Sequence, residues 1–470
     1  MTSTISWAEA ELSAAALGDA RLTRRAVVIA QAFAAHPEAS VLGATRAAGA
    51  GAAAKAAYRF FDNDRVEGAA LIGSHRHASG FRAAGERVVL AVQDTTPLDY
   101  SAHEGTQGLG ILTDPYHFGL WVHTTLLVTP HKVPLGVIGQ QVWVRPAEET
   151  GKKHTRKQRP VDQKESRKWL AALKETARFA RALPRTRVVM VGDREADLYD
   201  LFRRAERFRQ PVLIRAAQDR RVEGPERRLW PHLEAQPVAG TRTIETPRRP
   251  SQPSRKAVLS VRFAPVCLRP PGERKGKFWP TLSVWGVLAR EEAPPEGVKP
   301  VEWLLLTSVP VENAADAEER IEWYCCRWVI EEYHRVLESG CRVEARQLQT
   351  AERLRRCLAL DAIVAWQILY LTRHGRAHPQ EPCTSVLSPD EWPVLYAAAH
   401  PRRPVPEVPP TLREVTHWIA GLGGFLGRKG DGEPGALTLW RGWRRLQDFL
   451  LAWQLFQEHT SHPPPDDGCG

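Results

Sequence analysis

Three acidic residues stand at positions suited to metal-assisted hydrolysis. One of them, Glu331, is the last residue of a Tyr-x2-Arg-x3-Glu motif that consists of Tyr324, Arg327 and Glu331. Far upstream, two apolar runs each end in an aspartate, Asp94 in VVLAVQDTT and Asp193 in VVMVGDREAD. Carboxylates offer the hard oxygen ligands that Mg²⁺ and Mn²⁺ take, and two such ions activate a water and stabilise the leaving oxygen of a phosphodiester. The three acids therefore suggest a two-metal site that cuts DNA.

Both aspartates follow segments with the pattern of buried strands. Residues 88–92 and 188–191 are continuous apolar runs, typical of strands that are covered on both faces. In open α/β sheets, ligands and metals gather at the carboxyl ends of the strands. The alternative is an aspartate that caps a helix or turn. Asp197 fits that alternative better, because it precedes an amphipathic helix, and Asp193 is then left to face solvent and a metal.

The segment around Glu331 has the pattern of a two-faced helix. At 100° per residue, one face about 80° wide carries Tyr324, Arg327, Glu331, Arg335 and Glu338. The opposite face is apolar and consists of Cys326, Val329, Ile330, Tyr333, Val336 and Leu337. Such a polar stripe suits the binding of phosphates beside a metal-binding carboxylate. The alternative is a surface helix with ordinary salt bridges.

Length and charge agree with a nucleic-acid partner. A chain of 470 residues exceeds a single hydrophobic core and should divide into about three domains. The formal net charge is +11, which favours a polyanionic partner. Two basic runs flank the segments with the acids: Lys152, Lys153, Arg156, Lys157 and Arg159, and then Arg248, Arg249, Arg255 and Lys256. Such runs are often solvated loops, but their position here favours contact with DNA phosphates.

Cysteine and histidine usage gives no zinc or disulfide signature. The seven cysteines include the adjacent pair 325–326 but no CxxC motif, and the histidines of HRH at 75–77 have no partner cluster, so we expect them on the surface. No signal peptide opens the chain, and no apolar run reaches about eighteen residues. We therefore expect a soluble, cytoplasmic protein without membrane contact.

An ordered set of motifs extends over nearly the whole chain. It comprises AALGDARLTRR, AYRFF at 57–61, QDTT, WVHTTLL, VWVRP, KESRKWL, GDREADLYD, EWLLLTSVPVE, YCCRWVIEEYHR and a tryptophan-rich tail. With these motifs, and with Asp94, Asp193 and Glu331 where that family keeps its acids, the chain resembles the bacterial DDE transposases of the insertion-sequence-four family. The resemblance implies that the three acids are catalytic and bind two divalent cations, normally Mg²⁺, for which Mn²⁺ substitutes.

The resemblance also implies DNA contacts. Around the cleavage site the matching phosphate-contacting residues are Tyr324, Arg327, Arg335 and Arg215. Trp303 matches a tryptophan that stacks a flipped base, and the alternative is a core tryptophan in a strand. The family uses its N-terminal helices, here with Arg21, Arg24 and Arg25, to recognise transposon ends. One position departs from the family signature, because Glu338 stands where the family has a lysine, and this puts one phosphate contact in doubt.

The implied activity is cut-and-paste transposition on double-stranded DNA. It begins with nicking at each transposon end, continues through a hairpin and its opening, and finishes with strand transfer into target DNA. The protein would act as a homodimer in a synaptic complex, at the bacterial nucleoid. One alternative is a domesticated nuclease or an inhibitor with the same fold, for which the only hint is Glu338. Another is a metal-dependent phosphohydrolase that does not act on DNA, which leaves the basic runs and Trp303 unexplained.

The order of elements predicts an α/β fold. Strands are expected at 87–94, 119–129, 134–144, 187–193 and 211–218, with helices at about 162–182 and 197–208, the order of a ribonuclease H-like catalytic core over residues 81–345. An all-β insertion at about 220–310, with strands near 257–263, 281–289 and 302–308, precedes the Glu331 helix. A helical end-binding domain, 1–80, and a helical dimerisation and DNA-contact domain, 346–470, flank the core.

The C-terminal region ends in an aromatic stripe. Residues 439–456 carry, at helical spacing, Trp440, Trp443, Leu446, Leu450 and Trp453. Such a stripe is usually core, but near a chain end it can equally be a partner face, as the family's dimerisation region suggests.

Overall fold

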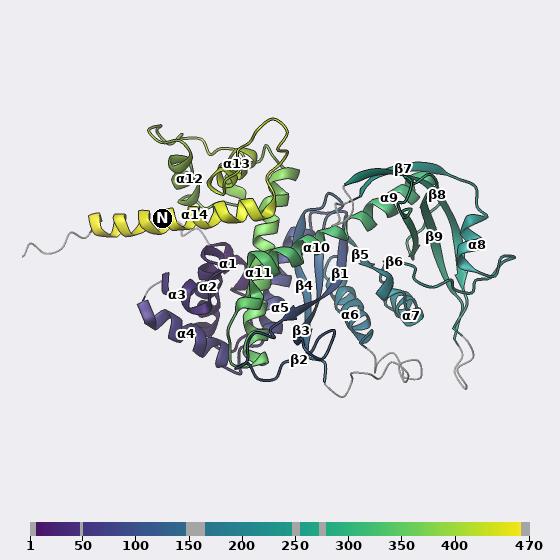
Figure 1. Ribbon diagram of the computed structural model, residues 1–470, viewed down its shortest axis with the longest axis horizontal. Coiled ribbons are helices and arrows are strands. Elements are labelled where there is room, and N and C mark those ends of the chain that lie inside the picture. The colour runs from purple at the N-terminus through teal and green to yellow at the C-terminus, as the bar shows by residue number, and fades with distance from the viewer. Residues whose placement is uncertain (1–5, 48–49, 147–164, 247–253, 272–278, 462–470) are drawn as a thin grey trace, which may run out of the picture.

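A single large sheet forms the centre of the molecule (Figure 1). The computed structural model describes residues 6–47, 50–146, 165–246, 254–271 and 279–461. Within these residues, ten strands form one mixed sheet in the order β2-β3-β1-β5-β6-β10-β9-β8-β7, and β4 also pairs with β3. The strands are β1 (Val88–Asp99), β2 (Gly110–Ile111), β3 (Phe118–Val128), β4 (Pro134–Trp143), β5 (Arg187–Gly192), β6 (Val212–Arg215), β7 (Gly240–Thr246), β8 (Arg255–Leu268), β9 (Leu282–Glu291) and β10 (Glu302–Thr307).

Strands β1 and β3 to β6 have the order expected from the sequence. β1 pairs antiparallel with β3 and β3 antiparallel with β4, while β5 lies parallel to β1 and β6 parallel to β5. The helices α6 (Arg167–Arg181) and α7 (Tyr199–Phe208) connect the later strands. This is the ribonuclease H-like arrangement. Residues 89–92 of β1 are fully buried, which explains why this strand is apolar on both faces rather than alternating.

The insertion continues the same sheet. β10 pairs antiparallel with β6, and β9, β8 and β7 follow in antiparallel order. These strands, together with the short helix α8 (Leu229–Glu234), form the end of the molecule farthest from the N-terminal helices (Figure 1). The chain then returns through helix α9 (Ala314–Cys325), which packs against β8 and β9 on its way to Glu331.

Helices cover the other end of the sheet. The N-terminal group is α1 (Trp7–Leu12), α2 (Ala20–Ala35), α3 (Val41–Ala47), α4 (Ala50–Asp62) and α5 (Gly68–Ala83). After α10 (Trp328–Arg335) comes the long helix α11 (Ala351–Ala377), which contacts α2, α5 and β4 and therefore lies between the N-terminal helices and the sheet. The C-terminal helices are α12 (Glu391–Ala399), α13 (Leu412–Leu422) and α14 (Ala436–Ser461). α14 extends along the upper left of the molecule (Figure 1).

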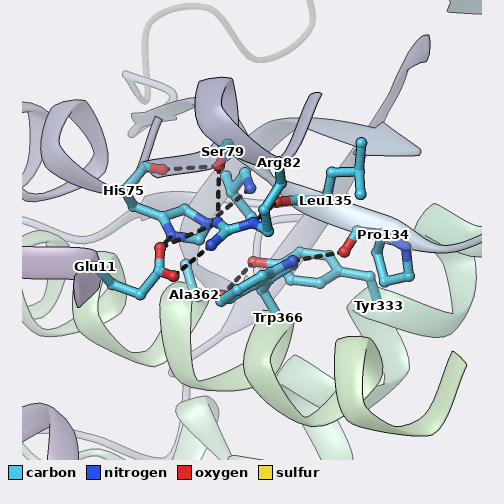
Figure 2. Close-up of polar contacts among 10 residues, drawn as sticks. Glu11, His75, Ser79, Arg82, Pro134, Leu135, Tyr333, Ala362 and Trp366 are labelled. Carbon is cyan, nitrogen blue, oxygen red and sulfur yellow. Dashed lines mark hydrogen bonds and ion pairs between the residues drawn. The ribbon is translucent and has the colours of Figure 1, made fainter. Parts of the chain in front are cut away.

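A buried polar network joins the N-terminal helices to the sheet (Figure 2). Glu11 of α1 accepts hydrogen bonds from Arg82 at 2.6 Å and from His75 Nδ1 at 2.6 Å, both from α5. The other nitrogen of His75 accepts the Val137 amide of β4 at 2.9 Å. The Arg82 guanidinium lies 4.3 Å from the ring centre of Trp366 on α11. The expectation that His75 lies on the surface is wrong, because this side chain is fully buried and both its ring nitrogens are used.

Close packing at this network requires a glycine in β4. Gly136 has φ of 153°, and a Cβ there would lie 1.8 Å from the Ser79 hydroxyl oxygen. The missing side chain lets α5 approach the strand closely enough for Arg82 to reach the Leu135 carbonyl at 2.7 Å. Trp366 donates to the neighbouring Pro134 carbonyl at 2.8 Å. The three elements α1, α5 and α11 are therefore fixed against β4 by polar as well as apolar contacts.

Candidate active site

Asp94 and Asp193 lie at neighbouring strand ends. The parallel register pairs Val92 of β1 with Val191 of β5. Each aspartate stands two residues further on, so the two are level at the carboxyl ends of adjacent strands, the usual place for ligands in such sheets. Asp94 accepts a hydrogen bond from its neighbouring amide at 2.8 Å, in the part of β1 that passes beyond β5.

The expectations about capping in DREAD need correction. Asp193 caps a single 3-10 turn, because its Oδ1 accepts the Glu195 amide at 2.9 Å, so only its other oxygen is free of capping. Asp197 does not cap α7. It is 2% exposed, pairs with Arg220 at 2.7 Å and accepts two amides of the loop after β6. A carboxylate that is buried there gains more from a paired arginine than it would from an exposed helix end.

Glu331 stands in the first turn of α10, and the predicted continuous helix is in fact broken. α9 ends at Cys325 and α10 begins at Trp328, with a turn at 326–327 between them. The predicted apolar face is buried throughout. On the predicted polar face, Glu331 and Arg335 are exposed, but Tyr324 is only 4% exposed and belongs to the core. The prediction from 100° per residue therefore identified the buried face of the segment correctly but placed Tyr324 on the polar face, which is wrong.

Arg327 connects two of the three acids. Its Nη1 lies 3.5 Å from Asp94 Oδ2, and its Nη2 donates to Glu331 Oε1. The pKa of Asp94 is raised to about 6, mainly by burial and also by the negative charges of Asp193 and Glu331, against the opposing effects of the Thr95 amide and Arg327. Burial also raises the pKa of Asp193. Asp94 therefore lies close enough to Asp193 and Glu331 for their negative charges to act on it.

This donor set fits a divalent cation in its chemistry. In the part of the chain that the structure describes, no three His, Cys, Asp or Glu side chains are placed together to hold a metal ion. Arg327 instead supplies the positive charge between Asp94 and Glu331. The carboxylates of Asp94, Asp193 and Glu331 come from separate elements and are nevertheless the hard oxygen donors that Mg²⁺ or Mn²⁺ takes, and such a set leaves positions open for water and substrate.

Aromatic residues pack beside the acids. The Tyr324 ring lies 5.4 Å from the ring of Trp303, and Trp328 lies 5.9 Å from Trp303 on another side. Arg215 of β6 hydrogen-bonds Tyr324, whose pKa is raised by burial and by the charge of Asp193. Trp303 is 5% exposed within the main core, so its resting place is that of a core tryptophan. To stack a base, its side chain would have to leave this packing.

Glu338 lies in a π-turn and contacts the catalytic strand. The turn spans Val336–Gly340 directly after α10. Glu338 accepts a hydrogen bond from the Thr96 hydroxyl at 2.7 Å, and burial raises its pKa. Thr96 stands two residues after Asp94, so the residue that departs from the family signature is attached to the strand that carries Asp94.

Two further residues near the acids were quoted in motifs but given no role from sequence. His123, in WVHTTLL, lies buried on β3, and its Nδ1 is 2.9 Å from the Thr95 hydroxyl. Lys168, in KESRKWL, binds Glu195 at 2.9 Å and opposes the burial that raises the pKa of Asp193. The signal available in the sequence was that both residues lie in motifs that match the family. A single histidine or lysine does not indicate a functional site by itself.

The other predicted DNA contacts are only partly described. Arg21, Arg24 and Arg25 are exposed on α2, away from the acids. The basic run at 152–159 and the arginines at 248 and 249 lie outside the described residues. Arg255 pairs with Glu291 on β9, so the end of the second run is partly neutralised within the sheet. None of the helices that the structure describes is long and apolar enough to cross a membrane.

Three family models match the chain in succession. Residues 4–66 match the transposase DNA-binding model, residues 153–366 the transposase DDE domain, and residues 363–456 the dimerisation domain of transposase Tn5. Asp193 and Glu331 fall within the DDE match, and α14 within the dimerisation match. The chain therefore belongs to the Tn5-like DDE transposases, which makes it a metal-dependent, dimer-forming enzyme that binds DNA, cuts it and transfers DNA strands.

Proposed function

We propose that this transposase moves DNA by a cut-and-paste route, in which it binds the end repeats of a transposon, cleaves them through a hairpin intermediate and joins the free 3′-hydroxyl ends to target DNA. The observation that supports this proposal is that Arg327 pairs with both Asp94 and Glu331, while the charge of Asp193, at the neighbouring strand end, also acts on Asp94.

In the proposed site, Asp94, Asp193 and Glu331 hold two Mg²⁺ ions. Bound there, the ions would activate the attacking water or hydroxyl and stabilise the leaving oxygen. Burial of Asp94 disfavours its isolated negative charge, so this carboxylate is suited to a site that is used together with a cation. Arg327 now pairs with Asp94 and Glu331. Once these carboxylates bind the ions, its guanidinium would be able to bind a phosphate through two parallel hydrogen bonds.

Hairpin formation would involve the aromatic group. Trp303 contacts Tyr324, which feels the charge of Asp193, so only one aromatic ring separates Trp303 from the acids. A base that is flipped from the end of the duplex would replace part of that packing, and stacking on a side chain contributes roughly 1–3 kcal/mol per base. Tyr324, Arg215 and Arg335 would contact the phosphates beside it.

The proposed organisation follows three domains, 1–80, 81–345 and 346–470. The exposed arginines of α2 would read the transposon end, and the C-terminal domain would pair two chains in a synaptic complex. The helix α11 belongs to the proposed third domain but packs against α5 and β4, so the three domains share one core.

A cleavage assay with matched variants tests the proposal. The native chain, with Mg²⁺ and duplex DNA that carries the flanking repeats of its own gene, should nick the ends and then form hairpins. Asp94→Asn, Asp193→Asn and Glu331→Gln should abolish nicking but leave end binding in a gel shift intact, because each change removes a metal ligand and little structure. Substantial cutting by Asp193→Asn would exclude the proposed triad, and flanking DNA without repeats would favour a domesticated nuclease.

A further inference from the structure

A large hollow lies at the edge of the sheet opposite the acids. Its volume is about 1100 Å³, and it is open to solvent. The hollow is lined by the starts of the parallel strands β1 and β5, by the turn that leads into β6 and by the end of α6. Six residue steps of about 3.3 Å separate Val88 from Asp94 along β1, so the hollow is roughly 20 Å from the catalytic acids.

The lining of this hollow is strongly basic. Five arginines contribute to it, from three separate stretches of chain: Arg87, Arg181, Arg185, Arg187 and Arg209. Two acids oppose them, and one of these, Glu319, already pairs with Arg320. All five arginines are exposed, and within the described residues none of their side chains makes a hydrogen bond or an ion pair. The hollow therefore has a net positive charge that the protein itself does not neutralise.

The fold places some of these arginines directly beside one another. The Arg187 amide donates to the Arg87 carbonyl at 2.9 Å, so the residue just before β1 lies beside the first residue of the parallel strand β5. The starts of the two strands therefore bring arginines of distant sequence positions to the same edge of the sheet.

We infer that this hollow binds the phosphate backbone of a second segment of duplex DNA, one that is not being cut. The guanidinium group matches phosphate oxygens and is weakly hydrated, so an unpaired arginine is well suited to the contact. A duplex fits better than a small anion, because the five arginines surround a wide open hollow rather than converge on one point. A duplex bound here lies at the opposite end of the strands from the acids and cannot itself reach them.

The test compares two triple variants of the full-length protein. In the first, Arg181, Arg185 and Arg187 are changed to alanine. In the matched control, the three exposed cations Arg227, Arg269 and Lys299 of the insertion are changed to alanine, which removes the same net charge. Binding to a duplex without transposon ends is measured from about 50 to 200 mM salt, because each phosphate contact contributes about 0.9 to the slope of log affinity against log salt.

We expect the slope of the first variant to fall by about 2 to 3, with the control unchanged. Nicking of transposon ends and the melting temperature should stay at the native values, because the acids lie far away and no described contact is lost. Equal slopes in the two triple variants would overturn the inference, and so would a loss of slope that accompanies a lowered melting temperature. Competition by micromolar pyrophosphate would show a small-anion site and would also overturn it.

Discussion

At the scale of single residues, charge near the acids is balanced by groups that the chain supplies itself. Arg327 pairs with Asp94 and Glu331, and Lys168 pairs with Glu195 beside Asp193. Asp94 has a pKa raised to about 6 because it is buried near two other acids. The charge of Asp94 is thus disfavoured by burial and by its neighbours, and a cation that approaches would stabilise it.

The buried histidine His334 should make stability depend on pH. Burial lowers the pKa of His334 to about 4, below the unfolded value of 6.5. The unfolded chain therefore binds a proton that the folded chain does not as pH falls from 6.5 to 4, and stability falls over that window. Between pH 7 and 5, this residue should remove about 2 kcal/mol from the free energy of unfolding.

The measurement is denaturant unfolding of the native chain and of His334→Phe at both pH values. The phenylalanine variant should lose about 2 kcal/mol less on acidification. His77→Phe on the exposed side of α5 serves as the control and should behave like the native chain. Equal losses in all three proteins would mean that other groups set the acid sensitivity.

At the scale of elements, the helical segment with Glu331 shows which features the hydrophobic pattern of the sequence predicts and which it does not. The apolar positions kept a helical period across 326–337, so their burial was predictable. The break at 326–327 and the π-turn at Val336–Gly340 change the rotation of the segment without changing that period. No residue type in this segment indicates either feature, so the sequence could not predict that Glu338 points toward Thr96.

The contact between Glu338 and Thr96 changes what Glu338→Lys should do. A lysine cannot accept the Thr96 hydroxyl, so this variant should lose a partly buried hydrogen bond worth roughly 1–3 kcal/mol. Glu338→Gln keeps the acceptor and removes only the negative charge. We expect Glu338→Gln to bind end DNA more tightly with an unchanged melting temperature, and Glu338→Lys to be less stable.

Dissociation constants for end DNA and melting temperatures, measured on both variants and on Thr96→Val, decide this prediction. Thr96→Val should share the instability of Glu338→Lys, because it breaks the same bond. A stable Glu338→Lys variant with higher cleavage would show that the contact is unimportant and that the position serves DNA binding, as in the family.

The network of Glu11, His75 and Arg82 should hold the N-terminal helices to the sheet. Removal of one partner leaves a buried charge uncompensated, which costs roughly 3–5 kcal/mol. Glu11→Leu should therefore lower the free energy of unfolding by about that amount. It should also speed proteolysis of residues before α5, because α1 loses its polar anchor. Glu9→Leu, on the exposed side of the same helix, is the matched control. An unchanged proteolysis pattern in Glu11→Leu would mean that apolar packing alone fixes α1.

At the scale of the whole molecule, the sequence predicted the order of the domains but not which polar side chains are buried between them. The order of strands and helices predicted the central sheet, because buried strands appear in the sequence as apolar runs and half-buried helices appear as amphipathic stretches. The network around His75 was not predicted, since Glu11 lies 64 and 71 residues from its partners His75 and Arg82 and meets them only in the folded chain. The aromatic stripe of the last helix likewise left core and partner face undecided.

The structure divides that stripe at one point along α14. Trp440, Trp443, Leu446 and Leu450 are buried against α12, α13 and the core. The helix then extends from the body of the molecule (Figure 1). Trp453 lies in this later part and is 39% exposed, and Phe449, four residues earlier on the same face, is 43% exposed. The first part of the helix therefore anchors it, and the second part presents aromatic surface of the kind enriched at protein interfaces.

Phe449→Glu combined with Trp453→Glu should therefore prevent pairing of two chains without unfolding either. Charges at the centre of an apolar interface leave it with unpaired, desolvated groups, whereas both positions are solvated in the single chain. Sedimentation with end DNA should show one chain per DNA end and no paired complexes, while binding to a single end stays at the native level. Phe81→Glu, which changes an exposed aromatic residue on α5, should leave pairing intact. Paired complexes that form normally with the double variant would place the dimer contact on another surface and leave the exposed end of α14 without this role.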